Sequence, residues 1–284
     1  MKRVQAIREF IEALISIWNE VKPTRMAAAL AYYGMFSFVP VVYIAIRVAG
    51  IFINDVLLSQ QVYDRLATTF GQNTATFVQD LILATDSTTT GGSTVATLVS
   101  AGALLYAASG LFFNLQYSLN TVWQVPPSEY AGILNNIKNR LMAFIMVIGV
   151  GLTLVLGAFS SLIVSSLTTI LPFEVIDPLL SALAFIGLAT LAFALLFKFL
   201  PEVKIAWRDV WLGALVTALI VSIGAWAIGF YFSISGVGSA FEAAGALAVL
   251  LIGINYIAQI FLAGAVFTRV YTMKYGSKSK LENA

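Results

Sequence analysis

The sequence has no cysteine and no histidine, and charged residues are scarce. Without cysteine, the chain has no disulfide bond, no thiolate ligand for a metal and no thiol nucleophile. Without histidine, it lacks the commonest general base and a common metal ligand. We therefore expect no catalytic residues, no metal site and no cofactor, and we expect that the protein is not an enzyme.

The low charge content predicts a membrane protein. Charged residues make up 11% of the 284 residues, hydrophobic residues make up 60%, and the mean hydropathy is +0.90. Soluble domains have roughly 25% charged and 45–50% apolar residues, so a soluble fold of this composition would expose its apolar excess to water. We expect membrane lipids as partners. The net charge of +2 gives no sign of a nucleic-acid partner, and none is expected.

Several apolar stretches are long enough to cross a bilayer, which takes about 20 residues in a helix. Six such spans are predicted, at residues 26–52, 93–122, 141–169, 178–200, 209–233 and 244–270. The expected fold is all-α, a polytopic six-helix transmembrane domain over 26–272 with a cytoplasmic tail at 273–284. The longest connection, 53–92, is amphipathic, so we expect short helices on the outer membrane face there, ending in a turn at 86–92.

Residues 1–25 precede the first span and carry apolar side chains at helical spacing. These side chains are Val4, Ile7, Ile11, Leu14, Trp18 and Val21. The pattern is typical of an amphipathic helix in the membrane interface. A helix packed on other cytoplasmic loops is the alternative.

The basic residues are distributed unevenly around the predicted spans. Fourteen of the sixteen Lys and Arg residues fall on one side, and only Arg47 and Arg65 fall towards the other, where seven carboxylates accompany them. Basic residues are retained on the cytoplasmic side, so both termini are predicted to be cytoplasmic.

Three segments resemble signatures of the YihY/BrkB family, in the same order and spacing. They are the first-helix segment 27–40 (AAALAYYGMFSFVP), the second-helix segment 109–125 (SGLFFNLQYSLNTVWQV) and segment 199–214 (FLPEVKIAWRDVWLGA). The resemblance implies a six-helix protein of the bacterial inner membrane. One departure occurs late in the last helix, where the family often has Gly-Ala-Glu and this chain has Gly264-Ala265-Val266.

Some members of that family have been labelled ribonuclease BN, and others virulence factor BrkB. Metal-dependent hydrolysis needs clustered ligands around an ion that activates water. Because the chain lacks histidine and its carboxylates fall mostly in loops, the sequence argues against ribonuclease activity.

Polar residues within the spans are the candidates for a substrate path, because polar groups in a bilayer usually face a partner or water. Ser109, Gln116 and Asn120 share one face of the second span, and Asn255 and Gln259 are one turn apart in the sixth. These side chains either bond neighbouring helices or line a hydrated path. If the two faces meet, four amides converge near the centre.

The first span adds Tyr33, Pro40 and Arg47, spaced by seven residues. Pro40 frees the carbonyl of residue 36, and Ser37 is placed to satisfy it. Arg47 either reaches the outer headgroups or pairs with Glu242 or an anionic substrate in an outer vestibule.

The third span carries small residues at every fourth position, which favours close helix packing. They are Gly149, Thr153, Gly157 and Ser161.

Two functions are consistent with the sequence. One is a transporter or lipid-handling protein with a central polar cavity and a small anionic or lipid substrate. The other is a non-transporting envelope scaffold that organises lipids. A homo-oligomer is compatible with both.

Overall fold

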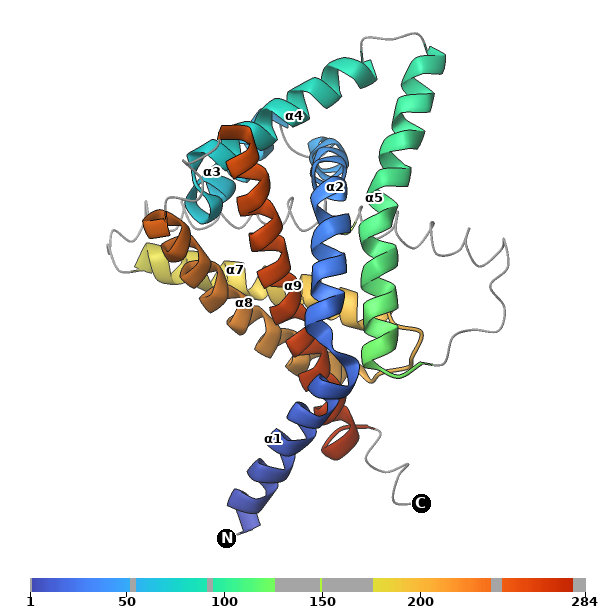
Figure 1. Ribbon diagram of the computed structural model, residues 1–284, viewed down its shortest axis with the longest axis vertical. Helices are drawn as coiled ribbons and strands as arrows, with labels where there is room; N and C mark the ends of the chain where they lie inside the picture. Colours follow the sequence, from blue (N-terminus) through green and yellow to red (C-terminus); the bar gives the residue numbers. More distant parts are fainter. Residues whose placement is uncertain are drawn as a thin grey trace.

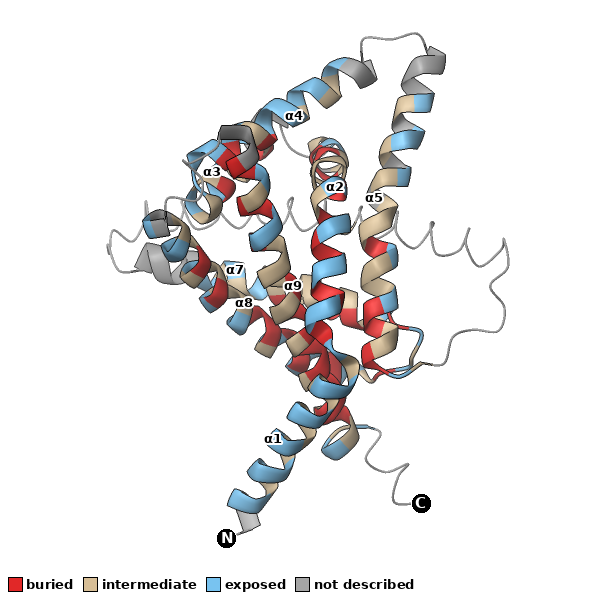
Figure 2. Cartoon of the chain, in the orientation of Figure 1, coloured by how far each residue is buried: buried red, intermediate tan, exposed pale blue. Residues whose placement is uncertain are grey.

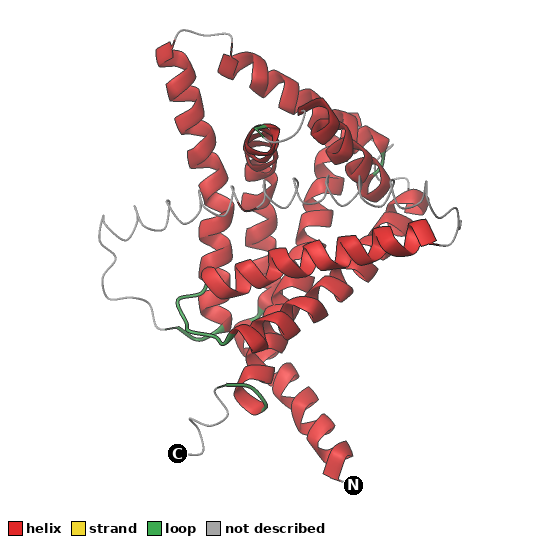
Figure 3. Cartoon of the chain, turned by 180° about the vertical axis from the view of Figure 1, so that it is seen from behind, coloured by secondary structure: helices red, strands yellow, loops and turns green. Residues whose placement is uncertain are grey.

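The computed structural model describes residues 2–51, 55–90, 94–125, 149, 176–235 and 242–277, and the regular structure of these residues is α-helical (Figure 3). The helices are α1 (Lys2–Val21), α2 (Pro23–Gly50), α3 (Asp55–Phe70), α4 (Gln72–Thr90), α5 (Thr94–Val122), α7 (Ile176–Phe199), α8 (Trp207–Ser235) and α9 (Glu242–Lys274). The all-α prediction is confirmed for this part of the chain.

Four helices of the described residues are long and apolar enough to cross a membrane. These spans are Pro23–Val48, Ala182–Phe199, Trp207–Phe232 and Gly245–Lys274. They match four of the six predicted spans. The span predicted at 93–122 coincides with helix α5, while 141–169 lies outside the described residues apart from Gly149.

Local backbone conformation explains where two helices end. Lys22 has a φ of 51° between α1 and α2, where Pro23 starts a new helix. Gly71 has a φ of +88° between α3 and α4, a conformation that glycine adopts without a steric penalty. The turn predicted at 86–92 is wrong for residues 86–90, because α4 continues to Thr90. Ser and Thr hydroxyls can compete with the helix for backbone hydrogen bonds. Here they bond within the helix, because the Thr85 hydroxyl donates to the Leu81 carbonyl and the Ser87 hydroxyl donates to the Ala84 carbonyl.

The helices form a bundle with distinct ends. Helices α2, α5 and α9 stand side by side, α7 and α8 cross them obliquely, α3 and α4 cover one end, and α1 projects from the other (Figure 1). We call the end that carries α1 the basic end, because basic residues gather there at helix termini and in the α7–α8 loop: Lys22, Arg25, Lys198, Lys204, Arg208 and Lys274.

The main hydrophobic core lies at the basic end (Figure 2). Its buried residues include Ala27 and Leu30 of α2, Leu119 and Val122 of α5, and Leu262 of α9. The apolar face of helix α1 is covered only along its second half. Leu14, Trp18 and Val21 pack against the core, whereas Val4, Ile7 and Ile11 are exposed.

Candidate functional site

The contact between α2 and α5, which we call the seam, contains a buried polar interaction at mid-length. Ser37 is 2% exposed and its Oγ donates a hydrogen bond to the carbonyl of Ala107 in α5 at 2.6 Å. The expectation that Ser37 satisfies the carbonyl of residue 36 was therefore wrong, because the α5 backbone comes close enough to accept the bond. Pro40 lies inside α2, which continues to Gly50.

Gly110 of α5 faces α2 at this point. A Cβ on Gly110 would lie 3.6 Å from Ser37 Oγ and 3.8 Å from Tyr33 Cδ1. Tyr33 therefore lies across Gly110 while its side chain remains 43% exposed. Ser109, one of the predicted path residues, donates to the carbonyl of Tyr106 in its own helix at 2.7 Å.

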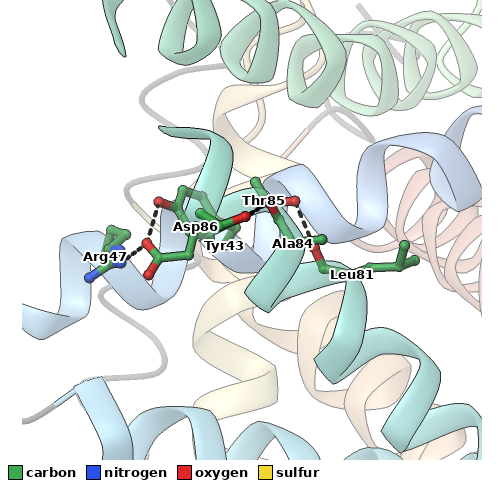
Figure 4. A network of polar contacts seen from close by, with 7 residues as sticks. Tyr43, Arg47, Leu81, Ala84, Thr85 and Asp86 are labelled. Atoms are coloured by element: carbon green, nitrogen blue, oxygen red, sulfur yellow. Dashed lines mark hydrogen bonds and ion pairs between the residues drawn. The ribbon is translucent and has the colours of Figure 1, made fainter. Parts of the chain in front are cut away.

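The end of the seam beneath α3 and α4 carries an ion pair. The Arg47 guanidinium of α2 pairs with the Asp86 carboxylate of α4, and the hydroxyl of the buried Tyr43 donates to the same carboxylate at 3.0 Å (Figure 4). The Arg47 guanidinium also lies 5.4 Å from the Tyr43 ring centroid. The structure thus gives Arg47 a partner in Asp86. Sequence reasoning named Glu242 for this role, whose side chain is outside the described residues.

At the basic end, α5 carries two amides that face the loop between α7 and α8. Gln116 Nε2 donates to the Glu202 carboxylate at 3.4 Å, and the Asn120 side-chain oxygen accepts from the Glu202 backbone N–H at 2.8 Å. Both amides thus hold the loop between α7 and α8. Two of the segments on which the family resemblance rests, 109–125 and 199–214, are joined by these bonds.

The amides of α9 form a separate pair. Gln259 Nε2 donates to Asn255 Oδ1 at 2.6 Å, and both side chains are partly buried. The hydrogen bonds among the described residues therefore divide the four amides into two pairs instead of joining them in one cluster.

Arg269 is a buried polar residue that sequence reasoning counted only as a cytoplasmic charge. Its side chain is 7% exposed, and its guanidinium donates to the carbonyl of Val122 at 2.6 Å and to Gln124 Oε1. Gln124 in turn donates to Glu20 of α1 at 2.5 Å. Arg269 therefore binds the carbonyl end of α5, where the helix dipole favours a cation, and links α9, α5 and α1.

Aromatic side chains are exposed along both sides of the seam. On α2 these are Tyr32, Tyr33 and Phe36, and on α5 they are Tyr106, Phe113 and Tyr117. Tyr32 packs edge-on against both Tyr33 and Phe36, with ring centroids 5.4 and 5.2 Å apart. Exposed aromatic residues suit contact with lipid, whose acyl chains are apolar and whose headgroup region accommodates the Tyr hydroxyl.

Among the residues that the structure describes, no group of three or more carboxylates is placed to hold a metal ion. Along α2 and α5 lies a series of polar groups: a guanidinium and a carboxylate near α4, hydroxyls at mid-length, and amides with a carboxylate where α5 meets the α7–α8 loop. Such groups bind and orient polar or charged molecules by hydrogen bonds and ion pairs.

Comparison with known proteins assigns the chain to a family. Residues 14–284 match the profile of the family described as "Virulence factor BrkB". A "UPF0761 membrane protein" of Saccharophagus degradans (strain 2-40 / ATCC 43961 / DSM 17024) is 25% identical over 270 residues, which are 94% of this chain and 60% of the relative. The chain thus spans about three fifths of the length of that curated relative. No solved structure matches the chain.

Proposed function

This chain belongs to the virulence factor BrkB family of membrane proteins, and we propose that it is a lipid-handling transporter that guides lipid headgroups along the seam between α2 and α5. The observation that carries the proposal is the presence of polar groups at three levels along α2 and α5, beside side chains exposed to the surrounding lipid. Arg47 with Asp86 lies at one end and Ser37 at mid-length, while Gln116 with Glu202 lies at the basic end, where α5 meets the α7–α8 loop.

Polar groups are costly in hydrocarbon unless they meet a partner. A lipid headgroup that moves between leaflets faces the same cost, and a line of hydroxyl, amide and charged groups lowers it at each level. The acyl chains remain in the bilayer, in contact with exposed rings such as Phe36 and Phe113. This division between polar seam and apolar flank favours an amphipathic substrate over a wholly water-soluble one.

Vesicles that contain the purified protein test the proposal. A lipid with a fluorescent headgroup is placed in both leaflets, and a membrane-impermeant reductant bleaches the outer leaflet. If the protein moves lipids, the inner-leaflet fluorescence also decays, and it does so faster than in protein-free vesicles. Flux no faster than in protein-free vesicles overturns the proposal.

Two glycines of α5 provide a matched pair of variants. Gly110→Leu fills the seam beside Ser37 and Tyr33, whereas Gly102→Leu adds the same side chain where a Cβ meets nothing within 4 Å. We expect Gly110→Leu to abolish lipid movement and Gly102→Leu to retain it. If both variants move lipid at the wild-type rate, the seam is not the path.

A non-transporting scaffold is the second candidate, and a specific observation favours it. Ser37, Gln116, Asn120, Asn255 and Gln259 all bond groups of the protein itself. Polar residues that serve only to join helices have this property. Such a scaffold gives no lipid flux in vesicles but changes the order or clustering of the lipids around it.

We further propose that the basic end lies in the cytoplasm and that the membrane is the bacterial inner membrane. The support is the excess of Lys and Arg at that end, since basic residues near helix ends are retained on the cytoplasmic side. A non-enzymatic role is part of the same proposal, as is a function without nucleic acid.

A further inference from the structure

Segment 199–214 has a buried half and an exposed half. The buried half includes Leu200, Ile205, Val210 and Ala214, which pack in the core at the basic end. These residues account for how the loop and the start of α8 are held. The exposed half comprises Lys204, Trp207, Arg208 and Trp211, and none of these side chains belongs to that core.

Three cationic groups lie around the junction of α7 and α8. Lys204 and Arg208 are exposed. Lys198, near the end of α7, donates through Nζ to the carbonyl of Ile205 at 2.5 Å and lies 5.4 Å from the Trp207 ring centroid. These two contacts fix the Lys198 ammonium between the loop and the exposed Trp207 ring.

The neighbouring carboxylates do not neutralise the exposed cations. The Asp209 carboxylate is buried and accepts from the backbone N–H and the hydroxyl of Ser277, both at 2.8 Å. The exposed Glu202 carboxylate accepts from the neutral Gln116 amide and keeps its charge, which is one negative charge against three cations. Within the part of the chain that the structure describes, neither Lys204 nor Arg208 forms an ion pair. The junction therefore presents positive charge to an external anion.

The same surface is also aromatic. Phe199, Trp207 and Trp211 are 48%, 43% and 45% exposed. The Phe199 and Trp207 rings meet edge-on with centroids 5.9 Å apart, and Trp211 follows one turn later on α8. Exposed Trp side chains beside cations at the end of a membrane-spanning helix match the level of phospholipid headgroups and the first acyl carbons.

We propose that Lys198, Lys204 and Arg208 bind the phosphate of an anionic phospholipid, whose glycerol and acyl chains lie along Trp207 and Trp211. A free phosphate ion has no apolar part for these rings to contact, so a lipid fits the surface better. The site lies at the junction of α7 and α8, which Glu202 joins to α5, and not between α2 and α5. It does not depend on whether the protein moves lipid.

Lipid binding to the protein in detergent tests the site. The purified full chain is titrated with phosphatidylglycerol or with phosphatidylcholine, and the number of bound lipids is measured by native mass spectrometry. We expect saturable binding of phosphatidylglycerol and weaker binding of phosphatidylcholine. Lys204→Gln combined with Arg208→Gln is expected to weaken phosphatidylglycerol binding roughly tenfold or more, because each basic residue contributes to the attraction.

The matched control is Lys22→Gln combined with Arg25→Gln, which removes the same charge from exposed residues at the same end. We expect this control to bind like the wild type. Equal loss in both double variants reveals a general charge effect and overturns the proposal, as does equal binding of the two lipids. Displacement of the lipid by millimolar inorganic phosphate also overturns it. Because the substituted side chains are exposed, an unchanged thermal midpoint verifies folding in the same samples.

Discussion

Thr268 of α9 packs directly onto Gly213 of α8, so closely that a Cβ on the glycine would overlap the threonine side chain. The contact is repeated in reverse one turn away, where Thr217 of α8 packs onto Gly264 of α9. Each threonine hydroxyl donates to the glycine carbonyl four residues earlier in its own helix at 2.7 Å. All four residues are buried. Each threonine satisfies its polar group locally, so two membrane-spanning helices can pack closely through glycine and threonine.

Substituting either glycine should destabilise the protein. Gly213→Ala and Gly264→Ala each place a methyl group where a threonine already lies, and overpacking of this kind costs about 1–3 kcal/mol. We expect a lower thermal midpoint in detergent for both variants. The control is Gly187→Ala in α7, where a Cβ meets nothing within 4 Å. It should be neutral or stabilising, because alanine favours helix over glycine. An undiminished midpoint in both test variants contradicts the described packing.

Arg269 should contribute to stability through bonds that lysine cannot reproduce. Its guanidinium spans the carbonyl of Val122 and the side chain of Gln124. Hydrogen bonds from charged groups contribute about 1.5–3 kcal/mol each, and burial makes an unsatisfied carbonyl costly. Arg269→Lys keeps the charge but lacks the planar fork. We therefore expect a clear loss in the free energy of unfolding for Arg269→Lys, whereas the exposed Arg25→Lys should change it little. Similar values for the two variants refute this role.

The sequence predicted the helical class and the uneven charge because both follow from local composition. Runs of apolar residues and clusters of Lys and Arg are visible without knowing which helices meet. It also identified Gln116 and Asn120 as polar residues on one helix face. Their partner, Glu202, is 82 residues beyond Asn120, and periodicity carries no information about which loop a helix face will meet.

Other features escaped sequence reasoning for similar reasons. The Ser, Thr and Gly residues that follow Asp86 predict a turn, yet α4 continues through the Ser and Thr residues, so the carboxylate reaches Arg47 from a helix. The close packing expected at Gly149, Thr153, Gly157 and Ser161 falls outside the described residues apart from Gly149. A tight contact is found between α8 and α9, where glycine and threonine also recur at intervals of four. The spacing of these glycines and threonines is visible in the sequence, but the sequence does not indicate which helix each one packs against.

Tyr43 should matter more than Arg47 to the stability of the α2–α4 contact. The Arg47–Asp86 pair is 42% and 37% exposed in its side chains, and exposed ion pairs contribute about 0–1 kcal/mol. Tyr43 is buried at 6% exposure and donates to the same carboxylate. We expect Tyr43→Phe to cost about 1–2 kcal/mol in the free energy of unfolding and Arg47→Gln to cost less.

A double-mutant cycle separates the two contributions. In the Asp86→Asn background, the cost of Arg47→Gln should largely disappear. In the wild-type background, raising the salt concentration should reduce the cost of Arg47→Gln, since salt screens exposed ion pairs. The cost of Tyr43→Phe should respond little to salt. A larger effect for Arg47→Gln than for Tyr43→Phe is the outcome that rejects this ranking.

The arrangement of the two ends predicts which residues are accessible from each side of the membrane. Lys274 of α9 donates to the carbonyl of Glu9 in α1, so these helices share one end, whereas α4 lies at the other. Because the chain has no cysteine, single cysteines introduced at exposed positions react without background. Ser16→Cys and Lys204→Cys should be labelled by an impermeant maleimide only in inside-out vesicles, and Gln79→Cys of α4 only in intact cells. Labelling of Ser16→Cys and Gln79→Cys from the same side contradicts the arrangement, because the membrane would then not separate α1 from α4.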